Sequence, residues 1–149
     1  MDLKDVCAVI TGGASGLGLA CAQAIVTAGG KVVLFDVQDD KGMDAAANLG
    51  VSYIKTDVTE EAGVLANVAR AQALMRGLNA AISCAEILGA GRVLGKQGPM
   101  PLSQFEATVR VNLIGSFNVA KAAANLMQSN TPGLDGERGV IINTASVAA

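Results

Sequence analysis

Apolar residues form short runs that recur along the whole 149-residue chain, separated by longer stretches of mixed polarity. Runs of about four to eight aliphatic residues indicate buried strands, and longer stretches with helical periodicity indicate helices. We predict strands at residues 6–10, 31–35, 51–54, 79–84 and 140–144. We predict helices at residues 17–28, 39–49, 60–75, 103–110 and 112–127.

Alternation of strands with helices favours right-handed βαβ units and a parallel sheet covered on both faces. The expected fold class is therefore α/β, a doubly wound parallel sheet of Rossmann type, truncated after the fifth strand. Turn-forming residues concentrate at 89–101 and 129–139, within a predicted loop at 85–101 and after the last helix. We interpret these segments as insertions on a single domain spanning residues 1–149.

The composition of the chain limits the classes of binding partner that we expect. The chain is 51% hydrophobic but only 3% aromatic, with 18 glycines, which is typical of helices packed closely on a parallel sheet. The net charge is −2 and no basic run is present, so nucleic acid and anionic membranes are not expected partners. No apolar run approaches the roughly 20 residues that span a bilayer.

The residue types that are missing or unpaired also limit the chemistry. The chain has no histidine, which excludes a Ser-His-Asp triad, a histidine base and a histidine zinc site. Its three cysteines, Cys7, Cys21 and Cys84, include no Cys-x-x-Cys pair, so we expect neither a disulfide framework nor a metal. Together with the lack of a signal-peptide pattern, this favours a cytoplasmic protein, or the mature form of an organelle protein.

A glycine-rich turn, Thr11-Gly-Gly-Ala-Ser-Gly-Leu-Gly18, joins the first predicted strand to the first helix. A phosphate can bind there if the backbone approaches closely and the helix N-terminus presents its N–H groups. Gly12 would form the tight turn, Gly16 would admit a pyrophosphate, and Gly18 would let the helix lie close to the sheet. An ordinary loop is the alternative, but the strand before and the helix after favour a dinucleotide site.

Asp36 ends the second predicted strand, where a carboxylate can accept hydrogen bonds from the adenosine ribose hydroxyls. The same charge would repel the additional phosphate of NADP, so Asp36 favours NAD. Alternatively Asp36 caps the following helix, although Asp39 or Asp40 can fill that role. A methyltransferase that binds S-adenosylmethionine also uses a glycine turn and a strand-end acid, and it remains open.

The turn resembles the Thr-Gly-x-x-x-Gly-x-Gly signature of the short-chain dehydrogenase/reductase family, and three later segments match the family in order. Asp57-Val58 matches its adenine-binding acid, Asn112 its catalytic asparagine and Ser146 its catalytic serine. The resemblance implies catalytic roles for Asn112 and Ser146. It implies cofactor contacts for the following residues: Gly12, Ser15, Gly16, Leu17, Gly18, Asp36, Asp57, Val58, Cys84 and Ala85.

Residues 139–149, the helical segment 116–119 and the long loop after Cys84 resemble, more narrowly, the type-2 3-hydroxyacyl-CoA dehydrogenases within that family. This implies hydride transfer to NAD from the secondary alcohol of a small-molecule substrate of the hydroxyacyl-CoA or hydroxysteroid class. It also implies a homo-oligomer. The alternative is a nucleotide-binding module without catalysis.

Two departures from the family pattern modify these expectations. The family's Tyr-x-x-x-Lys pair, which follows the serine, has no counterpart, because the single tyrosine is Tyr53 and Asp57 stands four residues later. We therefore expect an N-terminal, cofactor-binding portion of such an enzyme that is inactive alone. Glu86 stands where the family has a glycine, and its bulk and charge are expected to weaken NAD binding. The apolar last strand is expected to form an exposed sheet edge.

Overall fold

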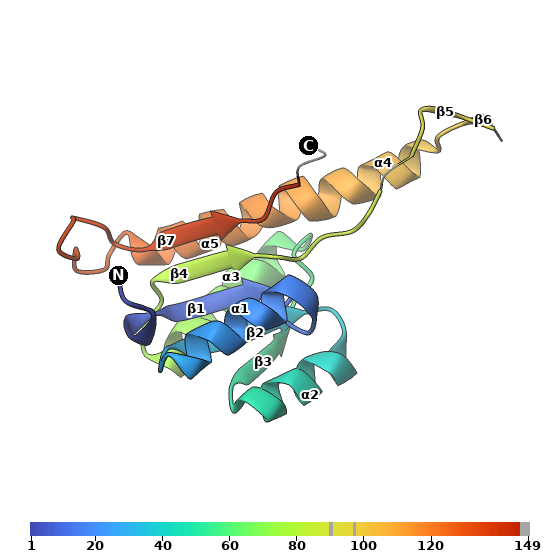
Figure 1. Ribbon diagram of the computed structural model, residues 1–149. Helices are drawn as coiled ribbons and strands as arrows, with labels where there is room; N and C mark the ends of the chain where they lie inside the picture. Colours follow the sequence, from blue (N-terminus) through green and yellow to red (C-terminus); the bar gives the residue numbers. More distant parts are fainter. Residues whose placement is uncertain (90, 97, 147–149) are drawn as a thin grey trace.

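Five parallel strands form the centre of the computed structural model, which describes residues 1–89, 91–96 and 98–146 (Figure 1). The strands lie in the order β3-β2-β1-β4-β7 across the sheet. Their bounds are β1 Cys7–Thr11, β2 Lys31–Asp36, β3 Ser52–Lys55, β4 Ala80–Ser83 and β7 Val140–Asn143. The predicted parallel sheet is confirmed, with strand ends displaced by at most one residue.

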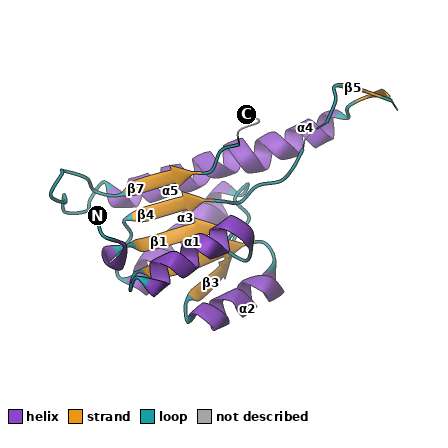
Figure 2. Ribbon diagram, viewed as in Figure 1, coloured by secondary structure: helices purple, strands orange, loops and turns teal. Residues whose placement is uncertain are grey.

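Helices cover both faces of this sheet (Figure 2). The helices α1 (Gly16–Thr27) and α2 (Asp39–Leu49) pack on one face, and α3 (Glu61–Met75) and α5 (Ser116–Met127) pack on the other. Successive strand residues point to opposite faces, so Ile10 and Leu34 join the α1 side while Val9 and Phe35 join the α3 side. The strands β1, β2 and β4 are buried on both faces, which explains their nearly continuous apolar sequences, whereas β7 at the sheet edge is largely exposed.

The chain reverses its direction of travel across the sheet after β3. It runs from β1 through β2 to β3 at one edge, then returns through α3 to β4 on the other side of β1. The carboxyl ends of β1 and β4 therefore flank a topological switch point, where open α/β sheets bind ligands. The doubly wound, Rossmann-type arrangement predicted from the sequence is thus present.

The prediction of two separate helices at residues 103–110 and 112–127 is wrong. One continuous helical segment runs from α4 (Leu102–Thr108) through a π-helical stretch, η2 (Val109–Gly115), into α5. A π turn adds residues to a helix and shifts the phase of its apolar face, which explains why the pattern around Val111 suggested a break. Gly115 lets this helix approach α3's preceding loop, since a Cβ there would lie 2.5 Å from Cγ2 of Val58.

The segment predicted as a loop at 85–101 contains two short antiparallel strands, β5 (Leu94–Gly95) and β6 (Gly98–Pro99). They lie beyond the end of α4, away from the main sheet (Figure 1). A short 3₁₀ helix, η1 (Leu3–Asp5), precedes β1. Residues 90, 97 and 147–149, which belong to the predicted loop and to the segment 139–149, lie outside the described residues. No helix in the part of the chain that is described has the length and apolarity to cross a membrane.

Candidate functional site

The glycine turn between β1 and α1 requires two residues without side chains. Gly12 has φ of +63°, and a Cβ there would lie 2.6 Å from the carbonyl oxygen of Cys84. A Cβ on Gly18 would lie 2.3 Å from the carbonyl oxygen of Gly12. The turn therefore fits between the first turn of α1 and the end of β4 only as bare backbone. Ser15, the N-cap residue, makes no side-chain capping bond, so its hydroxyl does not occupy the N–H groups at the start of α1.

The Asp36 carboxylate fastens the end of β2 to this turn. Its Oδ2 accepts a hydrogen bond from the Ala14 backbone N–H at 3.1 Å, and its Oδ1 accepts one from the Gln38 N–H at 3.1 Å. Asp36 is only 8% exposed. Each carboxylate oxygen has further lone pairs, so a ligand hydroxyl can still bind there. The contact with Gln38, the N-cap residue of α2, shows that Asp36 also orders the start of that helix.

Thr11, which sequence reasoning did not single out, holds the ends of β1 and β4 together. Its side-chain oxygen accepts hydrogen bonds from the backbone N–H groups of Cys84 and Ala85, both at 3.1 Å. Thr11 is 1% exposed. A threonine as the last residue of an otherwise apolar strand is the sequence signal that identifies such a position, because a buried hydroxyl needs a partner.

A cavity of about 620 Å³ opens at the carboxyl ends of the strands, a size in the range of small-molecule and cofactor sites. All ten residues expected to contact a cofactor line it. The sequence places them in four separate segments, and the fold brings these segments together around one space. The cavity is also lined by residues that were not among those ten: Phe35, Val37, Gln38, Thr56, Thr59, Glu86, Ile87, Ala107, Arg110, Val111 and Thr144.

Comparison with known proteins identifies the family to which this arrangement belongs. The model of the short chain dehydrogenase family matches residues 6–149. The chain belongs to the short-chain dehydrogenase family. The match includes the glycine turn, the acid at the end of β2 and the helical segment containing Asn112.

Individual relatives support this membership, and each is covered by the chain only in part. The 3-hydroxyacyl-CoA dehydrogenase type-2 of Bos taurus is 43% identical, with 99% of this chain and 58% of the relative covered. The Drosophila melanogaster protein of the same name is 38% identical, with 99% and 59% covered. The crystal structure of the Mycobacterium avium protein of that name superposes with a TM-score of 0.89 at 34% identity, covering 97% of this chain and 58% of that one. The chain spans less than three fifths of the length of these relatives.

In this member of the short-chain dehydrogenase family, Asp57 and Val58 occupy the loop after β3. The Asp57 Oδ1 accepts hydrogen bonds from the Thr59 N–H at 2.9 Å and the Thr59 hydroxyl at 2.8 Å. The Val58 carbonyl accepts a hydrogen bond from Nδ2 of Asn118, a buried side chain of α5, at 3.0 Å. Asn118 was not predicted as a site residue. Its signal was an amide within the apolar face of a helix, which must find a buried partner.

The two residues with expected catalytic roles do not line the cavity. The Asn112 side chain lies in η2 and bonds to the backbone of Ile87, accepting from its N–H at 3.0 Å and donating to its carbonyl at 3.1 Å. Ser146 is exposed and follows β7. Thr144 lines the cavity instead, and its hydroxyl donates to the Ser83 carbonyl at 2.9 Å.

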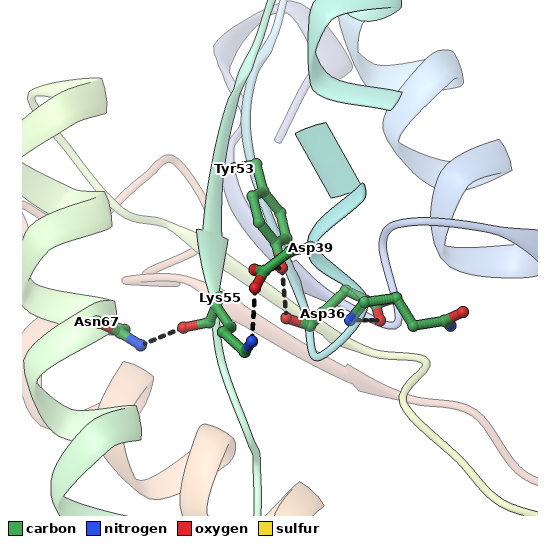
Figure 3. Close-up of polar contacts among 6 residues, drawn as sticks. Asp36, Asp39, Tyr53, Lys55 and Asn67 are labelled. Carbon is green, nitrogen blue, oxygen red and sulfur yellow. Dashed lines mark hydrogen bonds and ion pairs between the residues drawn. The ribbon is translucent and has the colours of Figure 1, made fainter. Parts of the chain in front are cut away.

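Tyr53, the single tyrosine of the chain, does not line the cavity. Its hydroxyl lies 3.0 Å from the Asp36 carbonyl oxygen and 2.9 Å from Oδ1 of Asp39 (Figure 3). Burial, and then the adjacent Asp39 carboxylate, raise the pKa of Tyr53 far above its ordinary value. Tyr53 therefore stays protonated at neutral pH and does not act as a base there.

Cys84 and Glu86 contribute to the wall that follows β4. Burial, Cys21 and Glu86 raise the pKa of the Cys84 thiol to about 11, so this cysteine stays a neutral thiol at neutral pH. Glu86 is exposed and lines the cavity, as does Arg110 on η2. Among the described residues, no group of three or more His, Cys, Asp or Glu side chains is arranged to hold a metal ion.

Proposed function

We propose that the cavity binds NAD, with the pyrophosphate over the glycine turn and the adenosine ribose at Asp36. The observation that carries this proposal is the joint position of the Asp36 carboxylate and the glycine turn in one cavity. The donor set fits the cofactor. Bare backbone at Gly12 and Gly18 lets the turn pack closely against the end of β4 and the start of α1. The open side of Gly16 would give a pyrophosphate access to the N-terminus of α1, and Asp36 offers acceptors to two ribose hydroxyls.

The reaction proposed for the enzyme is oxidation of a secondary alcohol, by analogy with relatives named 3-hydroxyacyl-CoA dehydrogenase type-2. Bound NAD would supply the hydride acceptor, and the hydroxyl proton would leave to a base. The substrate class is a hydroxyacyl-CoA or hydroxysteroid. The proposed catalytic members, which follow the family pattern, are Asn112 in η2 and Ser146 after β7.

For the 149-residue chain by itself we propose cofactor binding without turnover. The specific observation is Tyr53, whose hydroxyl is held by Asp36 and Asp39 and whose pKa is raised. A phenol in that state takes no proton from a substrate alcohol, and general acid–base catalysis contributes typically about 10²–10⁴-fold. This supports the alternative of a nucleotide-binding module for the isolated chain.

Titration calorimetry of the chain with NAD, NADP and S-adenosylmethionine tests the proposal. We expect NAD to bind, NADP to bind more weakly and S-adenosylmethionine not to bind. Asp36→Asn should weaken NAD binding by about 10-fold or more, the size of losing hydrogen bonds to a charged acceptor. Asp40→Asn, which removes the same charge from the first turn of α2, is the matched control and should leave NAD affinity unchanged.

Three other outcomes would contradict parts of this proposal. Binding of S-adenosylmethionine with no NAD binding would replace the dehydrogenase proposal by a methyltransferase-like one. Equal affinities of wild type and Asp36→Asn for NAD would remove Asp36 from the ribose site. An NAD-reduction assay with a 3-hydroxyacyl-CoA should show no turnover by the 149-residue chain, and measurable turnover would contradict the binding-module proposal.

A further inference from the structure

A polar cluster formed by Tyr53, Asp39 and Lys55 lies beside Asp36, one of the residues that line the cavity (Figure 3). The two carboxylate oxygens of Asp39 have different partners. Oδ1 accepts a hydrogen bond from the Tyr53 hydroxyl at 2.9 Å, and Oδ2 pairs with Nζ of Lys55 at 2.5 Å. Asp39 and Lys55 do not line the cavity. The cluster therefore lies outside the lining of the cavity.

Strand register places Lys55 next to Asp36. Asp36 in β2 and Lys55 in β3 are paired neighbours in the parallel ladder. Paired residues of adjacent strands send their side chains to the same face of the sheet, here the face that also carries Tyr53. Lys55 is consequently a cation attached directly beside the residue that would hold the ribose, yet its ammonium is bound to Asp39.

Tyr53 fixes the other side of Asp39. Its hydroxyl oxygen also lies 3.0 Å from the carbonyl oxygen of Asp36, so the single O–H is shared between two acceptors and connects α2 to the last residue of β2. The ring packs against Gly42 of α2, where a Cβ would lie 2.2 Å from Cε2 of the tyrosine. Lys55, and then Tyr53, lower the pKa of Asp39 below its ordinary value, so Asp39 is ionised at neutral pH.

We propose that Asp39 is a second determinant of NAD over NADP, because it holds the Lys55 ammonium away from the place where a 2′-phosphate would lie. This rests on the proposed function of the cavity. A lysine ammonium is a strong partner for phosphate, and Lys55 has a long flexible side chain attached beside Asp36. Asp39 occupies that ammonium, so Asp36 alone faces the ribose. Asp39 and Lys55 are specificity-determining residues and make no contact with the reacting atoms.

The test is the ratio of NADP affinity to NAD affinity, measured by calorimetry on the 149-residue chain. Asp39→Asn frees Lys55 and should raise this ratio about 10-fold, the size of one charge-assisted hydrogen bond to phosphate. Asp39→Asn combined with Lys55→Met should lose most of that gain. Lys55→Met alone should leave the ratio unchanged, because Asp39 already sequesters the ammonium. Asp40→Asn is the matched control, with the same charge change one residue along α2 and no expected effect.

The affinity ratio of Asp39→Asn tests the role of Asp39, and NAD binding by wild type tests the proposed function. A ratio that stays at the wild-type value in Asp39→Asn, and also in Asp39→Ser, which keeps a residue suited to a helix N-terminus, would overturn it. The proposal would also be overturned if the double variant kept the whole increase in the affinity ratio. The increase would then come only from removing the repulsion between the Asp39 carboxylate and the 2′-phosphate, and not from freeing Lys55. In both cases NAD binding by wild type leaves the proposed function standing. Failure of wild type to bind NAD would overturn both.

Discussion

The side chain of Asn112 and the backbone of Ile87 exchange two hydrogen bonds, one in each direction, at 3.0 and 3.1 Å. They connect the π-helical stretch η2 with the segment that leaves β4, 25 residues earlier in the chain. An amide is well suited to this role, because it offers one acceptor to the N–H and one donor to the carbonyl of the same residue. Asn112 thus positions the cavity wall at Ala85, Glu86 and Ile87.

Asn112→Ala removes both bonds, and we expect a loss of about 1 kcal/mol in the free energy of unfolding, because the site is exposed and water replaces the partners. The wall after β4 loses its support, so NAD affinity should fall several-fold. Urea unfolding and calorimetry measure the two effects. Asn48→Ala, an exposed asparagine on α2, is the matched control and should change neither. A variant with wild-type NAD affinity would show that Asn112 does not position this wall.

The sheet was predictable from the sequence because its buried strands are short β-branched runs bounded by glycine, and such runs have few other stable arrangements. The candidate cofactor residues were predictable because the glycine turn and the strand-end acids all lie at the carboxyl ends of parallel strands. Contacts between residues far apart in the chain were not predictable from the sequence. Thr11 with Ala85 and Asn118 with Val58 are pairs separated by 74 and 60 residues. The continuous helix through Val111 was missed because a π turn breaks the 3.6-residue period on which the prediction depended.

Glu86 adds a carboxylate to a cavity that already contains Asp36 and Asp57. Because NAD is anionic, we expect Glu86→Gly to tighten NAD binding about fivefold at low salt, and less at high salt, where exposed charges are screened. Glu86→Gln separates charge from bulk and should reproduce most of the gain if charge dominates. Glu106→Gln, on the exposed surface of α4, is the control. Calorimetry that finds equal affinities for all four proteins would show that Glu86 does not affect the site.

The Asp39 and Lys55 pair predicts a pH dependence of stability. The pKa of Asp39 is lower in the folded chain than its ordinary value of 3.8, mainly through Lys55. The carboxylate therefore stabilises the fold above that ordinary value, and the contribution disappears as the pH falls through the lower folded value. We expect the melting temperature of wild type to exceed that of Asp39→Asn at pH 7 and the difference to vanish in strong acid. A difference that grows as the pH falls would contradict this sign.

The outer edge of β7 predicts self-association of the 149-residue chain. Among the described residues, β7 pairs with β4 and no strand lies on its other side. Its Val140 N–H and the Thr144 N–H beyond it both point toward β4, so the alternating N–H groups between them point outward as unpaired donors. Val140 and Ile142 are 41% and 46% exposed. Such an edge recruits other chains, and a lysine on it prevents pairing.

We therefore expect light scattering to find dimers or larger species for wild type and a shift toward monomer for Ile142→Lys. Leu134→Lys, in the exposed segment before β7, adds the same charge away from the edge and should leave the mass distribution unchanged. The comparison separates strand pairing from general charge repulsion, because both variants gain one positive charge and only one alters β7. A monodisperse wild-type monomer would show that the β7 edge does not drive association.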